Sequence, residues 1–158
     1  MSNKGLAGLL VGIFAIELLA IHIINMLFYG VIKTWIFDLT IILQFILFLG
    51  VQQSGKGKDF IANIALLIIM PIVFIIALPT TTYEGGKEIL QNEITHDEVS
   101  FISTEFKTIQ TTDNSSWLLE NFYYHYEVQA SGDDLYYMIN PSNGDVYQLE
   151  EDFYRPFR

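Results

Sequence analysis

Three apolar segments fill most of the first half of the chain and constrain its fold more than any other feature. They cover residues 6–28, 35–51 and 60–78, and two short polar stretches separate them. A helix needs about 20 apolar residues to cross the roughly 30 Å hydrocarbon core of a bilayer, and the second segment is at the short limit of that range. The sequence therefore predicts a membrane all-α domain within residues 1–79, consisting of three transmembrane helices in contact with the lipid bilayer.

Lysine residues in the short connections indicate the orientation of these helices. A cytoplasmic N-terminus places Lys4, Lys56 and Lys58 inside and only Lys33 outside, as the bias of positive residues toward cytoplasmic loops requires. The first segment is longer than the apolar part of a signal peptide and no small-residue cleavage site follows it, so we expect it to stay attached. The prediction is a multi-pass protein of the plasma membrane, with a cytoplasmic N-terminus and an extracytoplasmic C-terminal domain.

The charge is divided unevenly along the chain. Residues 1–78 carry four basic and three acidic side chains, whereas residues 79–158 carry four basic and fifteen acidic ones, so the net charge of -10 separates into +1 and -11. Such an asymmetry indicates two different environments. We predict no nucleic-acid partner, because nucleic-acid binding requires Lys and Arg side chains that replace counterions.

Motifs for catalysis or cofactor binding are missing from the sequence. The chain contains no cysteine, which excludes disulfides, thiolate zinc sites, thiol catalysis and a cysteine-linked lipid anchor. None of the HExxH, GxSxG, Walker or GxGxxG patterns occurs. The three histidines, His22, His96 and His125, are far apart. We therefore predict no enzymatic activity, no catalytic residue, no cofactor and no metal site.

Gly8, Gly12 and His22 share one side of the first predicted helix. The two glycines form a small-xxx-small pair, which permits close approach of a second helix in a membrane. One interpretation is packing against the other helices of this chain, and the other is docking of a second membrane protein. His22 is predicted to donate an interhelical hydrogen bond rather than to bind a metal.

Glu17 lies near the middle of the first apolar segment, where a charge costs at least about 2.5–3.5 kcal/mol on insertion scales. No Lys or Arg occurs within the three apolar segments to pair with it. Three interpretations remain open. Glu17 makes a structural hydrogen bond, contacts a partner subunit, or handles protons or ions together with His22 and Asp38.

Residues 80–158 are acidic and carry strand and turn patterns. A helix is expected at residues 84–94 and a strand at residues 98–108. Short turns join three further runs of aromatic and β-branched residues, at residues 117–130, 135–140 and 145–150. Such a pattern is typical of an antiparallel meander. The sequence therefore predicts a small α+β extracytoplasmic domain with an antiparallel β-meander.

This domain holds more aromatic side chains than a small core needs. Alternation along a strand sends about half of them to each face. One interpretation is cross-strand aromatic pairing and contact with the bilayer surface. The other is an exported face that binds a protein, since tyrosine is favoured at interfaces. The residues assigned to this face are Tyr124, Tyr126, Tyr136, Tyr137 and Tyr147.

Residues 124–149 resemble the C-terminal half of a PepSY-type domain, over about a quarter of the chain. The matching residues are Tyr126, Val128, Gly132, Tyr137, Ile139, Asn140, Ser142, Gly144 and Val146. The upstream part departs from the family, whose members open with a longer, Ala-rich helix. The resemblance implies a non-enzymatic exported module that restrains peptidases or regulates proteins at the cell surface, and it brings no catalytic residues.

Together these features favour a non-enzymatic, membrane-anchored accessory or regulatory protein. Its exported domain is expected to bind a protein partner, either a surface enzyme or a larger membrane complex. The alternative is a small transporter subunit or an ion- or proton-handling protein that uses Glu17. Three helices are few for a pore, so this alternative requires a homo-oligomer.

Overall fold

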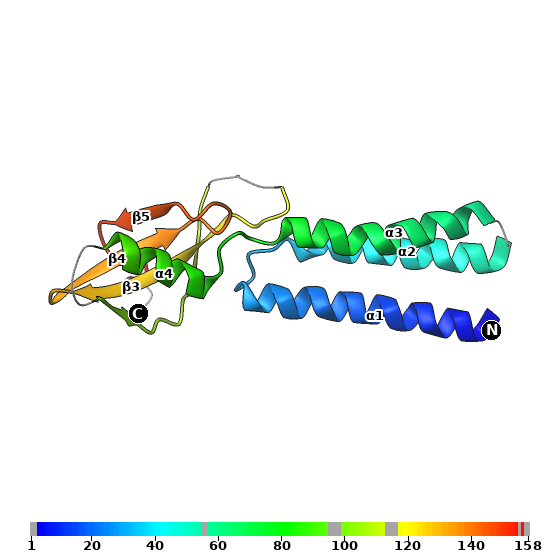
Figure 1. The fold of residues 1–158 in the computed structure, drawn as a ribbon, viewed down its shortest axis with the longest axis horizontal. Helices are drawn as coiled ribbons and strands as arrows, with labels where there is room; N and C mark the ends of the chain where they lie inside the picture. Colours follow the sequence, from blue (N-terminus) through cyan, green and yellow to red (C-terminus); the bar gives the residue numbers. More distant parts are fainter. Residues whose placement is uncertain (1–2, 55–56, 95–98, 113–116, 155, 157–158) are drawn as a thin grey trace. The chain divides into compact units, whose positions relative to one another are not determined.

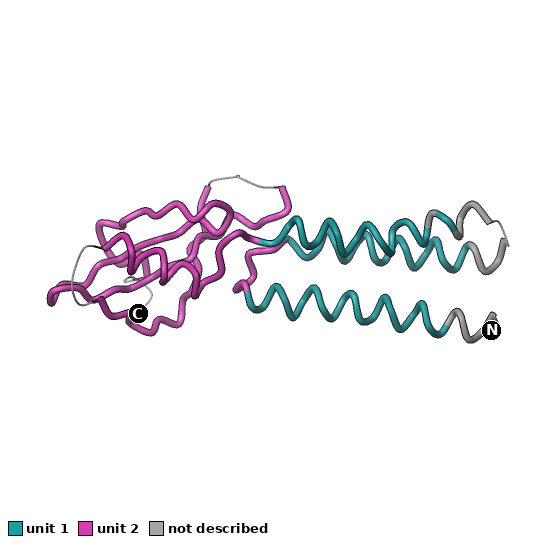
Figure 2. The backbone as a smooth tube through the Cα atoms, in the orientation of Figure 1, with its two compact units in different colours: residues 1–27, 33–78 teal, residues 28–32, 79–158 magenta. Residues whose placement is uncertain are grey.

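A computed structural model of the chain describes residues 3–54, 57–94, 99–112, 117–154 and 156. The chain divides into two compact units, which Figure 2 shows in different colours. The helical unit consists of residues 1–27 and 33–78, and the sheet unit consists of residues 28–32 and 79–158.

The helical unit contains α1 (Asn3–Leu27), α2 (Thr34–Ser54) and α3 (Gly57–Ala77). These helices can be followed in Figure 1, and both α1 and α3 pack against α2. The unit therefore has α2 as its central element.

Aromatic contacts and amide hydrogen bonds hold α2 to its neighbours. The ring of Phe14 in α1 meets Phe45 and Phe48 of α2 edge-on, at centroid distances of 6.1 and 6.3 Å. Between α2 and α3, Gln44 Nε2 donates to the Asn63 carbonyl at 3.3 Å and Asn63 Nδ2 donates to the Gln44 carbonyl at 3.1 Å. Both amide side chains are buried, and this reciprocal pair fixes the register of the two helices.

The prediction of three transmembrane helices is wrong. Among the described residues, only α1 contains a helix that is long and apolar enough to cross a membrane, Gly8–Leu27, by length and composition alone. The apolar helical stretches of α2 and α3 are Thr34–Gly50 and Asn63–Ala77. At 1.5 Å per residue these stretches extend about 25 Å and about 22 Å, less than the roughly 30 Å of hydrocarbon.

The sheet unit contains α4 (Tyr83–Glu93) and a five-stranded antiparallel sheet. The strands are β1 (Val99–Ile102), β2 (Thr108–Gln110), β3 (Phe122–Ala130), β4 (Asp133–Ile139) and β5 (Val146–Leu149). Their order is β1-β3-β4-β5, and β2 pairs with the opposite end of β3 from β1. The sheet therefore has more strands than predicted, because β1 and β2 replace the described part of the single strand expected at residues 98–108.

The connection between α1 and α2 belongs to the sheet unit, although the sequence predicted a simple turn between two helices. Tyr29 and Gly30 have positive φ angles of 53° and 79° and reverse the chain. Val31 and Ile32 are then buried, with 0% and 1% of their surfaces exposed. Ile32 forms an antiparallel bridge with Leu119, and the Glu120 N–H donates a 2.7 Å hydrogen bond to the Val31 carbonyl. This loop is thus part of the sheet unit's core.

α4 covers one face of the sheet. The Thr82 hydroxyl caps its N-terminus by accepting a 3.0 Å hydrogen bond from the Gly85 N–H. Leu90 is fully buried. Gly86 lies so close to Tyr126 of β3 that a Cβ atom there would overlap the phenol group. A glycine at this position therefore permits the close approach of helix and sheet.

Candidate functional site

The strand register divides the five predicted tyrosines between two faces of the sheet. Tyr126 pairs with Tyr137, and alternate residues of a strand share a face, so Tyr124, Tyr126 and Tyr137 lie on the side of α4. Tyr136 and Tyr147 lie on the opposite side. The five residues therefore do not form the single exported face that the sequence predicted.

Tyr83, Tyr124 and Tyr126 form an aromatic cluster between α4 and the sheet. The Tyr83 ring stacks on Tyr126 at 4.7 Å and meets Tyr124 edge-on at 5.7 Å. The Tyr126 hydroxyl donates to the Tyr83 carbonyl at 2.8 Å, and the Tyr83 hydroxyl donates to the His125 carbonyl at 3.0 Å. The Tyr124 hydroxyl has no hydrogen-bond partner among the described residues. This cluster belongs to the core and is not a binding surface.

Burial raises the pKa of all three phenols in this cluster above the usual value. Loss of hydration is the main cause, because it disfavours the phenolate more than the phenol. Neighbouring ionisable groups raise the pKa further, with Tyr29 acting on each of the three phenols and Glu84 on Tyr83 and Tyr126.

Phenylalanine substitutions should show that the two buried hydroxyls of β3 contribute differently to stability. We expect Tyr126→Phe to lower the free energy of unfolding by about 1–2 kcal/mol, since it removes a buried hydrogen bond. Tyr124→Phe should be neutral or slightly stabilising, because the hydroxyl it removes has no partner among the described residues. The free energy of unfolding of both variants is measured by denaturant titration of the full chain, with near-ultraviolet circular dichroism as the signal. Equal losses for the two variants would contradict this account of Tyr124.

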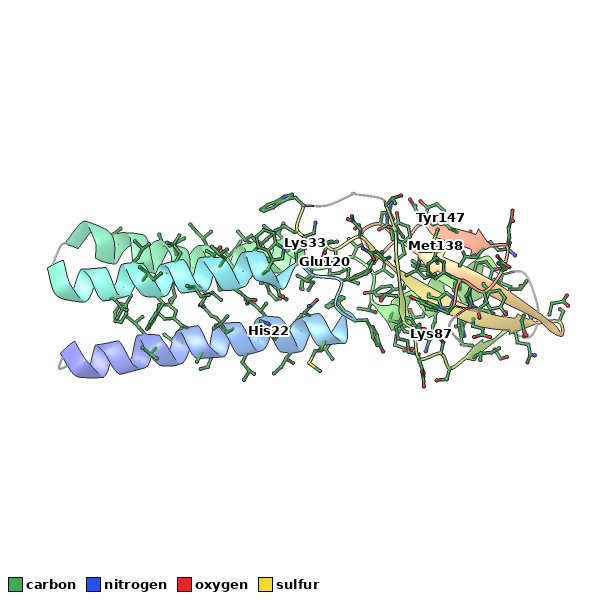
Figure 3. The ribbon with its side chains drawn as sticks, turned by 180° about the vertical axis from the view of Figure 1, so that it is seen from behind. His22, Lys33, Lys87, Glu120, Met138 and Tyr147 are labelled. Carbon is green, nitrogen blue, oxygen red and sulfur yellow. The ribbon has the colours of Figure 1, made fainter. Side chains whose placement is uncertain are left out.

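The face of the sheet opposite α4 carries a group of part-exposed aromatic and apolar side chains. We call five of these residues the open face: Ile102, Tyr136, Met138, Tyr147 and Leu149. Figure 3 labels Met138 and Tyr147. Tyr147 and Ile102 are 40% and 36% exposed. Tyr147 also contacts Tyr123, with ring centroids 5.8 Å apart. Sequence analysis identified Tyr136 and Tyr147 but missed the other three, because their common face depends on pairing between strands.

The C-terminal segment covers the part of this side of the sheet around His125. Tyr154 stacks on Phe106 at 4.3 Å and meets His125 edge-on at 5.4 Å. Its hydroxyl donates to the Thr108 carbonyl. His125 is completely buried, so this part of the sheet is closed to another molecule.

The rim next to the open face is acidic. The C-terminal segment forms a hollow of about 320 Å³, lined by Leu149, Glu150, Glu151, Asp152, Phe153 and Pro156. Leu149 belongs to both surfaces, so the apolar open face and the carboxylates are continuous. This arrangement suits a partner that presents apolar side chains bordered by Lys or Arg.

Gly8 and Gly12 pack against none of the described residues of the other helices. Both are exposed, and a Cβ atom added at either would meet nothing within 4 Å. The described residues therefore give no support to an internal packing face at these glycines, and both packing and docking of another membrane protein stay predictions.

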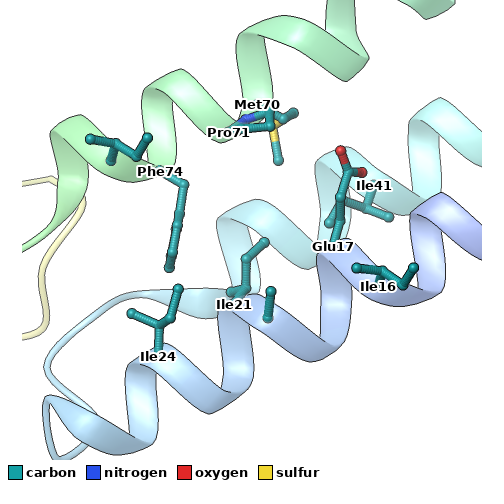
Figure 4. A pocket seen from close by; sticks show the side chains of 10 residues that line it. Ile16, Glu17, Ile21, Ile24, Ile41, Met70, Pro71 and Phe74 are labelled. Carbon is teal, nitrogen blue, oxygen red and sulfur yellow. The ribbon is translucent and has the colours of Figure 1, made fainter.

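Glu17 lines a cavity of about 280 Å³ in the helical unit. Figure 4 shows its carboxylate pointing from α1 toward Met70 of α3. The other lining residues are Ile16, Ala20, Ile21, Ile24, Ile41, Met70, Pro71, Phe74 and Ile75, all of them apolar. Glu17 Oε2 is shielded from solvent and has no hydrogen-bond partner among the described residues. The structural hydrogen bond considered from sequence is thus not made by this oxygen within the described part of the chain.

His22 and Asp38 come together at a different place. His22 Nε2 lies 3.7 Å from Asp38 Oδ2, which is too long for a hydrogen bond. His22 Nδ1 lies 3.0 Å from the Leu18 carbonyl in its own helix. The predicted interhelical hydrogen bond is therefore replaced by an intrahelical one. Neither His22 nor Asp38 lines the cavity of Glu17.

No group of three His, Asp or Glu side chains that would hold a metal ion occurs among the described residues, and His96 lies outside them. No protein-family model, no curated protein and no solved structure matches this chain.

Proposed function

We propose that the chain is a non-enzymatic, membrane-anchored accessory or regulatory protein whose sheet unit binds a protein partner through the open face. The observation that carries this proposal is the composition of that face. Five aromatic and apolar side chains are part-exposed on one side of a sheet whose other side α4 already covers. Exposed apolar groups of this kind, with Tyr and Met among them, are typical of protein interfaces.

The surface of α1 supports anchoring in a membrane. Only 11% of the most apolar part of α1 is buried, whereas a core helix of a globular domain would be mostly buried. We propose that α1 crosses the bilayer and remains attached, since Phe14 packs it against α2. With a cytoplasmic N-terminus, one crossing puts the sheet unit outside the cytoplasm.

The acidic rim indicates the charge of the protein that the open face binds. Carboxylates of Glu150 and Glu151 next to Leu149 favour a protein with basic residues around an apolar centre. The resemblance to PepSY-type modules is consistent with a surface enzyme that the sheet unit restrains. We therefore propose a basic extracytoplasmic protein as the partner.

Site-specific crosslinking in the cells that produce the protein tests this proposal. A photo-reactive phenylalanine analogue is placed at Tyr147, on the open face, or at Gln148, which is also exposed but points to the other side of β5. We expect a single stoichiometric product from Tyr147 and little from Gln148.

Alanine substitutions provide the quantitative check. Tyr147→Ala and Met138→Ala should each weaken binding of the crosslinked partner, after its purification, about tenfold or more. Equal crosslinking from both positions, no product from Tyr147, or unchanged affinity of the alanine variants would contradict the proposal.

The alternative of ion or proton handling receives less support from the geometry. A conducting path needs successive polar groups, but the cavity of Glu17 is otherwise lined by apolar residues, and the His22–Asp38 pair lies elsewhere. The surroundings of Glu17 suit the binding of a ligand better than the passage of an ion.

A further inference from the structure

The cavity beside Glu17 has the composition of a small-molecule site. Its volume is about 280 Å³, and residues of α1, α2 and α3 contribute to its walls (Figure 4). Small-molecule sites are mostly apolar cavities of about 300–1,000 Å³ in which a few polar groups orient the ligand. This cavity is at the small end of that range and has one polar side chain, Glu17.

The cavity offers a hydrogen-bond acceptor but no side-chain donor. Glu17 Oε2 is shielded from solvent and unpaired among the described residues. None of the other lining side chains carries an N–H or O–H group. A buried acceptor left without a donor costs about 1–3 kcal/mol. A ligand that brings a donor removes this cost, whereas a purely apolar ligand does not.

Pro71 lies in the wall of the cavity and interrupts the hydrogen bonds of α3. Proline has no N–H, so the carbonyl of Leu67, four residues earlier, lacks its usual helical donor. Residues four apart lie on the same face of a helix, and Pro71 itself lines the cavity.

These features together favour a cationic donor. A carboxylate binds a charged N–H donor more strongly than a neutral one, and an anion would be repelled. Aromatic walls also tolerate cations, and Phe74 is held in place by an edge-on contact with Phe37 at 5.1 Å. We propose that this cavity binds a lipophilic amine, with the apolar body between α1 and α3 and the ammonium group donating to Glu17.

Three compact probes with one apolar body but different head groups test this site. They are adamantylamine, adamantanol and adamantane carboxylate, added to the full chain in lipid nanodiscs. The readout is the ¹³C-methyl spectrum of methionine-labelled protein. Met70 lines the cavity, whereas Met26 is 76% exposed and Met138 lies in the sheet unit, so these two serve as internal references.

We expect saturable shifts of Met70 with the amine, and an affinity for the alcohol that is lower by about tenfold or more. The carboxylate should not bind. Glu17→Gln should weaken amine binding by a similar factor, and Glu17→Asp should retain part of it. Ala20→Leu, which fills the cavity without changing its charge, should weaken the amine and the alcohol together.

Asp38→Asn is the matched control, because Asp38 also has a shielded oxygen with no hydrogen-bond partner among the described residues, but it does not line the cavity. It should leave amine binding unchanged. The proposal is overturned by equal shifts of Met26 and Met70, by equal affinities for amine and alcohol, or by full amine affinity in both Glu17→Gln and Ala20→Leu. Failure of all probes, with Met70 instead protected by a helix that co-purifies, would make the cavity a protein-docking site and also overturn it. Neither result bears on the open face, which lies in the other unit.

Discussion

Replacement of Gly86 by alanine should destabilise the sheet unit by about 3 kcal/mol. The new Cβ atom would overlap the Tyr126 hydroxyl and lie 2.9 Å from its Cζ atom and 3.2 Å from Ile139 Cδ1. Tyr126 cannot move away easily, because it is 1% exposed, stacks on Tyr83 and donates to the Tyr83 carbonyl. Overpacking of this kind costs about 1–3 kcal/mol, and loss of the buried hydrogen bond adds about 1 kcal/mol.

Gly85→Ala is the matched control for this substitution. Both changes favour the helix intrinsically by about 1 kcal/mol, but a Cβ atom at Gly85 overlaps nothing, its nearest neighbour being Thr82 Oγ1 at 3.2 Å. We expect its free energy of unfolding to stay within about 1 kcal/mol of the parent. The measurement is hydrogen exchange of the β3 and β4 amides in the full chain. Unchanged protection in Gly86→Ala would show that α4 does not approach the sheet as closely as described.

The Gly86–Tyr126 contact also predicts a non-additive double variant. Tyr126→Phe removes the hydroxyl with which the new Cβ would overlap most. In the Gly86→Ala background this second change should therefore cost less than it does alone, or recover stability. Simple addition of the two losses would contradict a direct contact.

Alkaline pH should unfold the sheet unit cooperatively. Burial raises the pKa of Tyr83, Tyr124 and Tyr126 in the folded state above the value of about 10 that they have when unfolded. Below pH 10 both states keep the three protons, and the full stability is present. Above pH 10 the unfolded state loses protons that the folded state retains, so stability falls as the pH rises.

The expected slope is steep. Each phenol contributes about 1.4 kcal/mol per pH unit, and three contribute about 4 kcal/mol per pH unit above pH 10. Tyrosinate absorbance and near-ultraviolet circular dichroism should therefore change together in one transition. In Tyr124→Phe the slope should decrease by about a third. Ionisation of these three tyrosines near pH 10 in a sheet unit that stays folded would contradict the prediction.

Turn chemistry made the hairpins of the sheet predictable. Gly132 and Gly144 adopt positive φ angles of 92° and 79°, as glycines do in the turns between strands of alternating polar and apolar residues. The helix at Tyr83–Glu93 was also expected within a residue at each end. These features depend on neighbouring residues in the sequence, which is why local patterns reveal them.

The composition of the open face could not be predicted in the same way. Alternation shows that Tyr136 and Tyr137 point to opposite sides, but it does not show which side α4 covers. That choice depends on Gly86, whose missing side chain lets the helix approach Tyr126. Sequence gives no sign of such a contact, because the two residues are 40 positions apart.

Glu17 was recognised from sequence because a carboxylate within an apolar helix is costly, but its surroundings were not. The cavity depends on how α1 and α3 pack on α2, and on Pro71 in its wall. The prediction of three transmembrane helices failed because the apolar stretches of α2 and α3, within the described residues, are shorter than a helix that crosses a bilayer needs to be.

The loop of residues 28–32 changes how the two units are mechanically connected. Because it lies in the sheet unit, the chain passes between the units three times, after Leu27, before Lys33 and after Leu78. Most two-domain chains have one linker, so that either domain can be excised. A fragment starting at residue 79 would lack Val31 and Ile32 and expose the surface they cover. A force applied to the sheet unit by a bound molecule would be transmitted through three covalent tethers, one to each of the long helices.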